Sequence, residues 1–256
     1  MKPLIRFLIL GSLIVLAGAA CTGSREVIGS ESQPTSTSAA QEPVQATDPP
    51  AQAQPTNTTP AQTVTAAEVV DINSFTDSID ALHFIGLVRN TGTVDLEFVE
   101  ITVTLRDANN TLVAVESGYT SLDVVPVGQV SPFSVLFLEA PAEWSTYEID
   151  IQGEEADFLD PYTEFEVVSS TGRIPSFGGY EIVGEIRNTG VANAEFVEVI
   201  AVLYDVNNRI LGVDFTFTEF DIVEAGGTSP FSLIALSTAD GAIDHYDLFI
   251  EGSVAD

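Results

Sequence analysis

The chain has 256 residues and is strongly acidic, with 38 aspartates and glutamates against 8 lysines and arginines and a formal net charge of −30 at pH 7. A surface of this charge repels polyanions, so nucleic acids and anionic lipid surfaces are excluded as binding partners. The single cysteine excludes a disulfide within the chain and a cysteine-rich zinc site.

The first 20 residues have the features of a signal peptide. Lys2 and Arg6 form a short basic n-region, and Leu4 to Leu16 form an apolar stretch that is short for a membrane span. Small residues then lead to Cys21. The segment resembles the lipobox of prokaryotic lipoproteins, although Gly18 stands where that family prefers leucine. The resemblance implies a diacylglyceryl group on the Cys21 sulfur, cleavage before Cys21 and an extracytoplasmic protein anchored to the cell membrane. An ordinary signal peptide cut near Ala20, or an uncleaved anchor, is the alternative.

Residues 21–63 are dominated by Ser, Thr, Pro, Gln and Ala. They have no apolar periodicity and cannot bury enough surface to offset the entropy of ordering. We expect a disordered tether between the lipid anchor and a folded part.

The rest of the chain contains the same motifs twice. Three of them return at one spacing of 98 residues: Gly86–Gly92 as Gly184–Gly190, Phe98–Glu100 as Phe196–Glu198, and Ser131–Ser134 as Ser229–Ser232. A period of this length indicates a duplicated domain, because one unit is large enough to bury its own core. We predict domains at residues 64–158 and 162–256.

Each copy has the pattern of about seven short strands. Alternate residues face inward in one strand of the first copy: Val99, Ile101, Val103 and Leu105. The second copy keeps this phase from Val197, with Glu198 outward. Other strands are expected at 68–70, 84–88, 112–115, 133–137 and 147–151 and at their counterparts, with a loop through Tyr119. These elements predict an all-β fold of two tandem immunoglobulin-like β-sandwiches after the signal peptide and linker.

Two of the repeated motifs predict turns and strand starts. In Asn90–Gly92 and Asn188–Gly190, we expect a turn in which glycine supplies a positive φ and asparagine bonds its own backbone. A ligand-binding loop is the alternative. The Ser-Pro-Phe motifs are expected to start strands, with phenylalanine in the core. The outward Arg187 and Glu198 are expected to form a cross-strand ion pair, as are their first-copy counterparts.

Two other turn segments carry side-chain oxygens that could bind Ca²⁺. The candidate ligands are Asp107, Asn109 and Asn110 in the first copy and Asp205, Asn207 and Asn208 in the second. Both segments lack the glycine and the distal glutamate of an EF-hand loop, which favours a turn-forming role. His83 and His245 do not correspond in the repeats, and no nucleophile or nucleotide motif is present. We predict no catalytic residues, no cofactor and no enzyme activity.

Together these motifs resemble the FxLYD domain of prokaryotic secreted and surface proteins. The series runs through Gly-x-Val/Ile-x-Asn-Thr-Gly to Val202–Asp205, which reads Val-Leu-Tyr-Asp, and on to Gly-x-x-Ser-Pro-Phe. The first copy departs from it at Thr104–Asp107, where Arg106 replaces the tyrosine. The resemblance implies a β-sandwich and no common activity. CARDB adhesion domains have a similar Asn-x-Gly pattern and are the rival assignment.

These features predict a non-catalytic, lipid-anchored cell-surface protein. We expect its tandem sandwich to bind another envelope protein or to act as a spacer, and expect the membrane to be contacted through the lipid on Cys21. A Ca²⁺- or glycan-binding adhesion-type module and an accessory subunit of a secreted enzyme or transporter are the alternatives.

Overall fold

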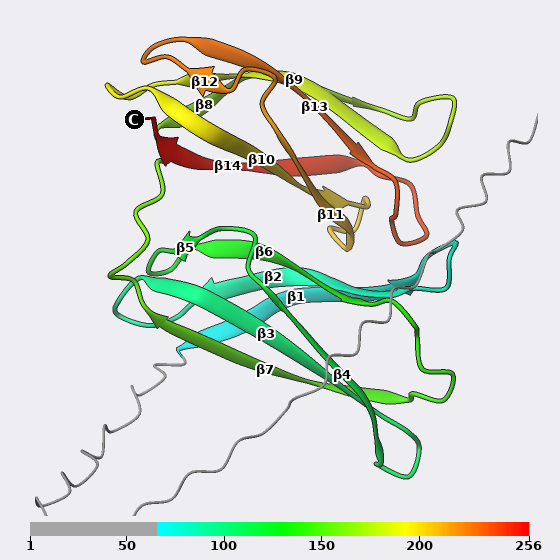
Figure 1. The fold of residues 1–256 in the computed structure, drawn as a ribbon. Coiled ribbons are helices and arrows are strands. Elements are labelled where there is room, and N and C mark those ends of the chain that lie inside the picture. The colour runs from blue at the N-terminus through cyan, green and yellow to red at the C-terminus, as the bar shows by residue number, and fades with distance from the viewer. Residues whose placement is uncertain (1–65, 256) are drawn as a thin grey trace, which may run out of the picture. The chain divides into compact units, whose positions relative to one another are not determined.

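The computed structural model describes residues 66–255, and every regular element in them is a β-strand (Figure 1). These residues belong to one compact unit that spans residues 58–256. The two sequence copies form two β-sandwiches of seven strands each, which confirms the predicted all-β fold. The predicted signal peptide, Cys21 and the tether lie outside the described residues.

The first sandwich contains strands β1 to β7. Their bounds are β1 Ala67–Thr76, β2 Leu82–Asn90, β3 Leu96–Arg106, β4 Leu112–Tyr119, β5 Val124–Val125, β6 Val130–Phe137 and β7 Thr146–Glu155. One sheet has the order β1-β2-β6, and the other has the order β4-β3-β5 with β7 also paired to β3. All pairings are antiparallel.

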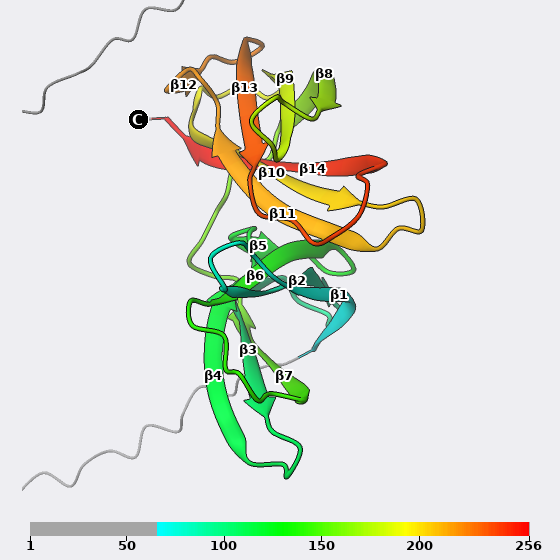
Figure 2. The ribbon, with the colours of Figure 1, turned by 90° about the vertical axis from the view of Figure 1, so that its right-hand side faces the viewer.

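The second sandwich repeats this topology with strands β8 to β14. Their bounds are β8 Phe165–Arg173, β9 Tyr180–Asn188, β10 Ala194–Tyr204, β11 Ile210–Phe217, β12 Ile222–Val223, β13 Thr228–Ala235 and β14 His245–Val254. The sheets have the orders β13-β9-β8 and β11-β10-β12, with β14 paired to β10. Figure 2 shows the two sheets of this sandwich as separate layers.

Each sandwich encloses its own core. The inward residues predicted in β3 are all buried, from Val99 to Leu105, and the predicted core phenylalanines Phe133 and Phe231 are at most 2% exposed. A glycine faces each of these rings: a Cβ on Gly86 would overlap Phe133, and Gly184 stands in the same relation to Phe231. The repeated glycine before the Asn-Thr-Gly turn is therefore required by core packing.

The predicted loop at Tyr119 is wrong, because β4 continues to this residue. Residues 112–119 pair with β3 throughout, and the pairing ends where Tyr119 lies opposite Glu100. The expected Arg187–Glu198 pair is wrong as well, because β9 and β10 belong to different sheets. Arg187 instead pairs with Glu166 on the neighbouring β8, at 2.6 Å.

The predicted bond from asparagine to its own turn is confirmed. Oδ1 of Asn188 accepts from the backbone N–H of Gly190 at 3.0 Å, and Nδ2 donates to the carbonyls of Ala192 and Val223 at 2.8 and 3.0 Å. Asn90 makes the equivalent three bonds in the first sandwich. Both asparagines are fully buried, so each ties a turn to the short strand beside it.

The positive φ expected at the turn glycines is wrong. Neither Gly92 nor Gly190 has one. At Gly190 the physical reason for glycine is space, because a Cβ would overlap the hydroxyl of Tyr162. That hydroxyl donates to Oδ1 of Asn188 at 2.8 Å, so the glycine leaves room for the Tyr162 side chain beside the turn.

A third apolar cluster joins the two sandwiches. Its buried members are Ile85 from β2, Val202 and Tyr204 from β10, and Ile210 from β11. Beside it, Nδ2 of Asn73 donates to the carbonyl of Ile210 at 2.7 Å. The four-stranded sheet of the second sandwich is therefore buried on both faces where this cluster lies.

No helix that could span a membrane occurs between residues 66 and 255.

Candidate functional site

A β-bulge with unusual backbone geometry occurs at the same place in both sandwiches. The pairing of β3 with β7 shifts between Glu97 and Glu100, and that of β10 with β14 shifts between Glu195 and Glu198. Inside each bulge a phenylalanine has a positive φ, 49° at Phe98 and 51° at Phe196. Bulky residues rarely adopt this conformation, which costs about 1–3 kcal/mol.

Neither phenylalanine is needed to fill a core. The side chain of Phe98 is 43% exposed and that of Phe196 is 70% exposed, while the following valines are buried. A bulge re-aims the side chains beside it and is common next to functional sites. We therefore take the surface around each phenylalanine as the candidate site.

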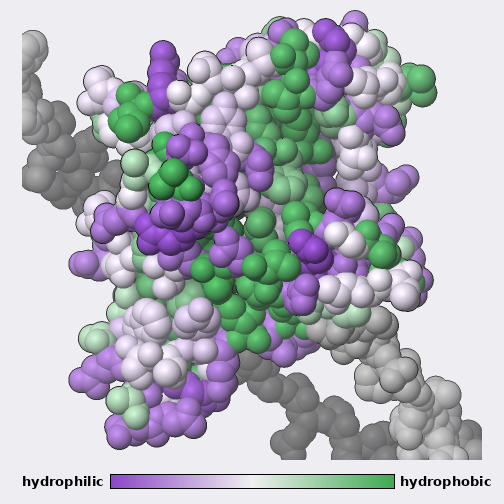
Figure 3. Space-filling model, turned by 180° about the vertical axis from the view of Figure 1, so that it is seen from behind, coloured by the Kyte–Doolittle hydropathy of each residue, from purple (hydrophilic) through white to green (hydrophobic). Residues whose placement is uncertain are grey.

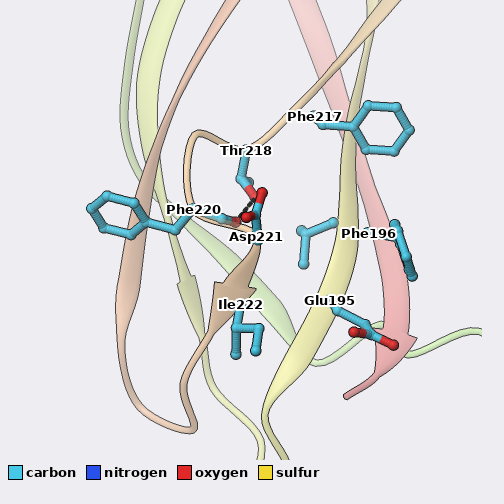
Figure 4. Close-up of a pocket in the computed structure, with 8 residues that line it drawn as sticks. Glu195, Phe196, Phe217, Thr218, Phe220, Asp221 and Ile222 are labelled. Atoms are coloured by element: carbon cyan, nitrogen blue, oxygen red, sulfur yellow. Dashed lines mark hydrogen bonds between the residues drawn. The ribbon is translucent and has the colours of Figure 1, made fainter. Parts of the chain in front are cut away.

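In the second sandwich this surface is an open, largely apolar groove of about 500 Å³. It lies between β10, the end of β11 and the segment that leads into β12, and is lined by Glu195, Phe196, Val197, Phe217, Thr218, Phe220, Asp221 and Ile222. Figure 4 shows the rings of Phe196 and Phe217 beside β10, with Thr218, Asp221 and Ile222 across from them. The volume lies within the range of protein binding sites.

The groove is built by local hydrogen bonds around Thr218. Its backbone N–H donates to the carbonyl of Val197 at 2.9 Å, which holds the end of β11 against the bulge. Its hydroxyl donates to the carbonyl of Phe220 at 3.1 Å, and the N–H of Phe220 donates to the buried hydroxyl of Ser229. The Ser-Pro-Phe motif thus fixes one wall of the groove as well as a strand of the core.

The groove leaves large apolar side chains in water. Phe217, Phe220 and Ile222 are each about half exposed, and Phe215 packs edge to face on Phe217 with 6.0 Å between ring centroids. Figure 3 shows that apolar surface gathers in patches between hydrophilic areas on one face of the described structure. Contiguous apolar surface on an otherwise acidic protein indicates an interaction site.

The first sandwich has the equivalent groove, lined by Phe98, Val99, Tyr119, Thr120, Leu122, Asp123 and Leu159. Six of these residues occupy the positions of groove residues in the second sandwich, 98 residues earlier in the sequence. The seventh, Leu159, comes from the connection that follows β7. The open space is about 260 Å³, roughly half of that in the second groove.

A buried carboxylate holds the connection in the first groove. Oε2 of Glu97 accepts from the backbone N–H groups of Phe158 and Leu159, at 3.2 and 2.7 Å. The ring of Phe158 lies near that of Phe98, with 6.4 Å between centroids, and remains 78% exposed. The half-buried Leu159 is therefore the less exposed of the two side chains, and Phe158 lies beside the strained ring.

The second groove keeps the carboxylate without such a segment. Glu195 stands at the position of Glu97 but is only half-buried, and its side chain accepts no hydrogen bond from residues 66–255. The two sites thus share their strands and their carboxylate, and in the first one residues 158 and 159 of the chain bond that carboxylate.

A second buried carboxyl lies where the first groove meets the second sandwich. Glu251, which is 6% exposed on β14, accepts from the backbone N–H of Asp123 at 2.9 Å. Burial is the main cause that raises the pKa of Glu251 to about 7, the charges of Asp123 and Glu198 contribute to this rise, and the hydrogen bond from Asp123 opposes it. The pKa of Glu198 is raised mainly by burial, then by Asp123. Protonation of Glu251 and Glu198 therefore makes the stability of the junction between the sandwiches depend on pH.

The Ca²⁺ candidates are placed in two hairpin turns. Oδ1 of Asp107 accepts from the backbone N–H of Thr111 and of Asn109, both at 2.8 Å, and these bonds lower the pKa of Asp107. Asn110 follows with a φ of 64°. This is the geometry of an aspartate that closes its own turn.

The second turn has the same construction. Oδ1 of Asp205 accepts from the N–H groups of Arg209 and Asn207, which lowers its pKa, and Asn208 has a φ of 62°. The structure brings the three candidates of each turn together but does not join the two turns. Among residues 66–255 no group of three or more His, Cys, Asp or Glu side chains is placed to hold a metal ion.

The groove residues were missed by sequence reasoning, although a signal was present. The repeated Phe98–Glu100 motif places phenylalanine one residue before the first inward valine, hence on the outward phase of the strand. An outward aromatic residue kept in both copies is not needed for the core. The positive φ and the role of Leu159 depend on the bulge and the connection, which alternation alone does not reveal.

The chain matches no known protein family and no curated protein at a significant level.

Proposed function

We propose that this chain is a non-catalytic surface lipoprotein whose tandem sandwich holds another protein of the cell envelope. The observation that carries the proposal is the open apolar groove of the second sandwich, with the strained, exposed Phe196 at its edge. Strain and exposed apolar surface both cost free energy in the isolated molecule, and a bound partner would offset that cost.

The proposed location follows from the sequence. The lipobox-like residues before Cys21 support lipid attachment and an extracytoplasmic protein, and the Ser/Thr/Pro-rich segment supports a tether between membrane and sandwiches. The motif series supports assignment of both sandwiches to FxLYD-type domains, for which a β-sandwich is the expected fold.

The test is to isolate the protein from its native membrane after mild crosslinking, and to identify by mass spectrometry both its N-terminal peptide and the proteins attached to it. We expect a lipidated Cys21 at the N-terminus and one recurrent envelope protein. A protein that is recovered alone at every crosslinker concentration, or that turns over a substrate, would contradict the proposal. A Cys21→Ser variant should be released from the membrane fraction while keeping its fold.

A further inference from the structure

The two grooves form an internal comparison in which the first displays a bound peptide segment and the second does not. In the first, residues 158 and 159 bend past the bulge and donate both backbone N–H groups to Glu97, and Leu159 lines the groove together with Phe98, Tyr119 and Leu122. The segment is recognised by its backbone and by one apolar side chain.

The second groove has the groups that this recognition requires. Glu195 is the acceptor at the position of Glu97, Phe196 is the strained ring at the position of Phe98, and Phe217 and Phe220 replace Tyr119 and Leu122. The substitutions place two phenylalanine rings in this groove, and its open volume is about twice as large. No segment within residues 66–255 lines it besides the strands and turns that build it.

We propose that the groove of the second sandwich binds a bent segment of a partner protein in which an aromatic residue is followed by leucine, as in Phe158-Leu159. Leucine enters the groove beside Phe217, the aromatic ring covers Phe196, and Glu195 accepts the backbone N–H groups of both residues. This inference rests on the proposed function as a protein-binding module and names its surface and the chemistry of its ligand.

Donation of backbone N–H groups to Glu195 distinguishes this ligand from one that binds through apolar contacts alone. A carboxylate oxygen that accepts the N–H groups of two successive residues selects polypeptide in a bent conformation, because in an extended strand these groups point to opposite sides. Such charge-assisted bonds are about twice as strong as neutral ones. The charge of Glu195 and Asp221 also disfavours acidic residues beside the apolar pair.

The experiment measures binding of a fluorescein-labelled peptide to the full chain in lipid nanodiscs by fluorescence anisotropy. The probe copies residues 155–161 with its acidic residues replaced by their amides. One control peptide has serine for both apolar residues, and a second has both of their amide nitrogens methylated. We expect saturable binding of the probe and a loss of at least about tenfold in affinity for either control.

The matched variants are Phe217→Ser in the second groove and Tyr119→Ser at the same position in the first. Both residues are about half exposed, so neither change empties a core. Phe217→Ser and Glu195→Ala should each weaken binding about tenfold or more, whereas Tyr119→Ser should leave it within about twofold. Melting curves of each variant verify that it is folded.

Four outcomes would overturn the inference: no saturable binding, equal affinity for the methylated peptide, equal loss in the two serine variants, or a concentration-dependent dimer of the chain that Phe217→Ser abolishes. The last would assign the groove to a second copy. Crosslinking to the native partner separates this inference from the proposed function. A partner recovered equally by wild type and Phe217→Ser contradicts the groove alone, whereas recovery by neither contradicts the function.

Discussion

Phe196 combines an unfavourable backbone conformation with a side chain that is mostly in water, so its replacement by glycine should stabilise the isolated protein. Glycine adopts a positive φ without strain but loses more entropy on folding, so we expect a net gain of about 1 kcal/mol in the free energy of unfolding. Urea or thermal unfolding measures this gain. Phe196→Ala is the control, since it removes the ring and keeps the strain. A Phe196→Gly protein no more stable than Phe196→Ala would refute the account.

Asn188 should be among the most sensitive polar residues. Its replacement by alanine leaves the carbonyls of Ala192 and Val223 without their donor in a buried turn, which should cost about 2–3 kcal/mol. Denaturant unfolding measures the loss. The exposed Asn207 is the control, and its replacement by alanine should change stability by less than about 0.5 kcal/mol. Similar losses at both positions would contradict a special role for the buried turn.

At the scale of elements, the two copies differ where the sandwiches meet. Thr104 of β3 corresponds to Val202 of β10, and Arg106 corresponds to Tyr204. The first-copy residues are half-buried, whereas Val202 and Tyr204 are buried in the cluster that joins the sandwiches. The outer face of β10 is therefore apolar because it packs against β2.

Reciprocal exchanges test this difference. Val202→Thr buries a hydroxyl without an assigned partner and should cost about 1–3 kcal/mol, whereas Thr104→Val should change stability by less than about 0.5 kcal/mol. Equilibrium unfolding of the two variants under the same conditions is the measurement. Equal effects would show that burial at this junction does not govern the stability of β10.

The strands and the repeat could be predicted because period-two alternation and a 98-residue spacing are local properties of the sequence. Pairings between sheets could not, which is why Arg187 was assigned to Glu198 and not to Glu166. Residue type alone predicts the positive φ at Gly190, because glycine adopts it most easily, but in the structure it occurs at Phe196. The groove follows from the bulge and from the path of residues 156–159, and both depend on tertiary contacts.

At the scale of the whole molecule, the junction carboxyl predicts a pH dependence of stability. Folding raises the pKa of Glu251 from its ordinary 4.5 to about 7, so the ionised form is disfavoured in the folded state. The cost is fully present above pH 7 and is relieved as the pH falls from 7 to 4.5. The free energy of unfolding should therefore rise by up to about 3 kcal/mol over this window on acidification.

The variant Glu251→Gln isolates this contribution, because its amide oxygen can still accept from Asp123 while carrying no charge. Its unfolding free energy should vary less between pH 7 and 4.5 than that of the wild type. Glu154→Gln removes an equal charge at an exposed position of β7 and should preserve the wild-type slope. A slope unchanged by Glu251→Gln would assign the pH dependence to the overall negative charge.

The occupied groove of the first sandwich also sets the valency of the molecule. Duplication produced two equivalent sites, and the connection after β7 lies across one of them, so residues 66–255 present a single vacant groove. Two vacant grooves on one chain would bridge neighbouring partners into a network, with the avidity that follows from tethering. With one, the proposed binding would engage a single partner through residues 66–255, and the expected stoichiometry is one to one however densely the chains are packed.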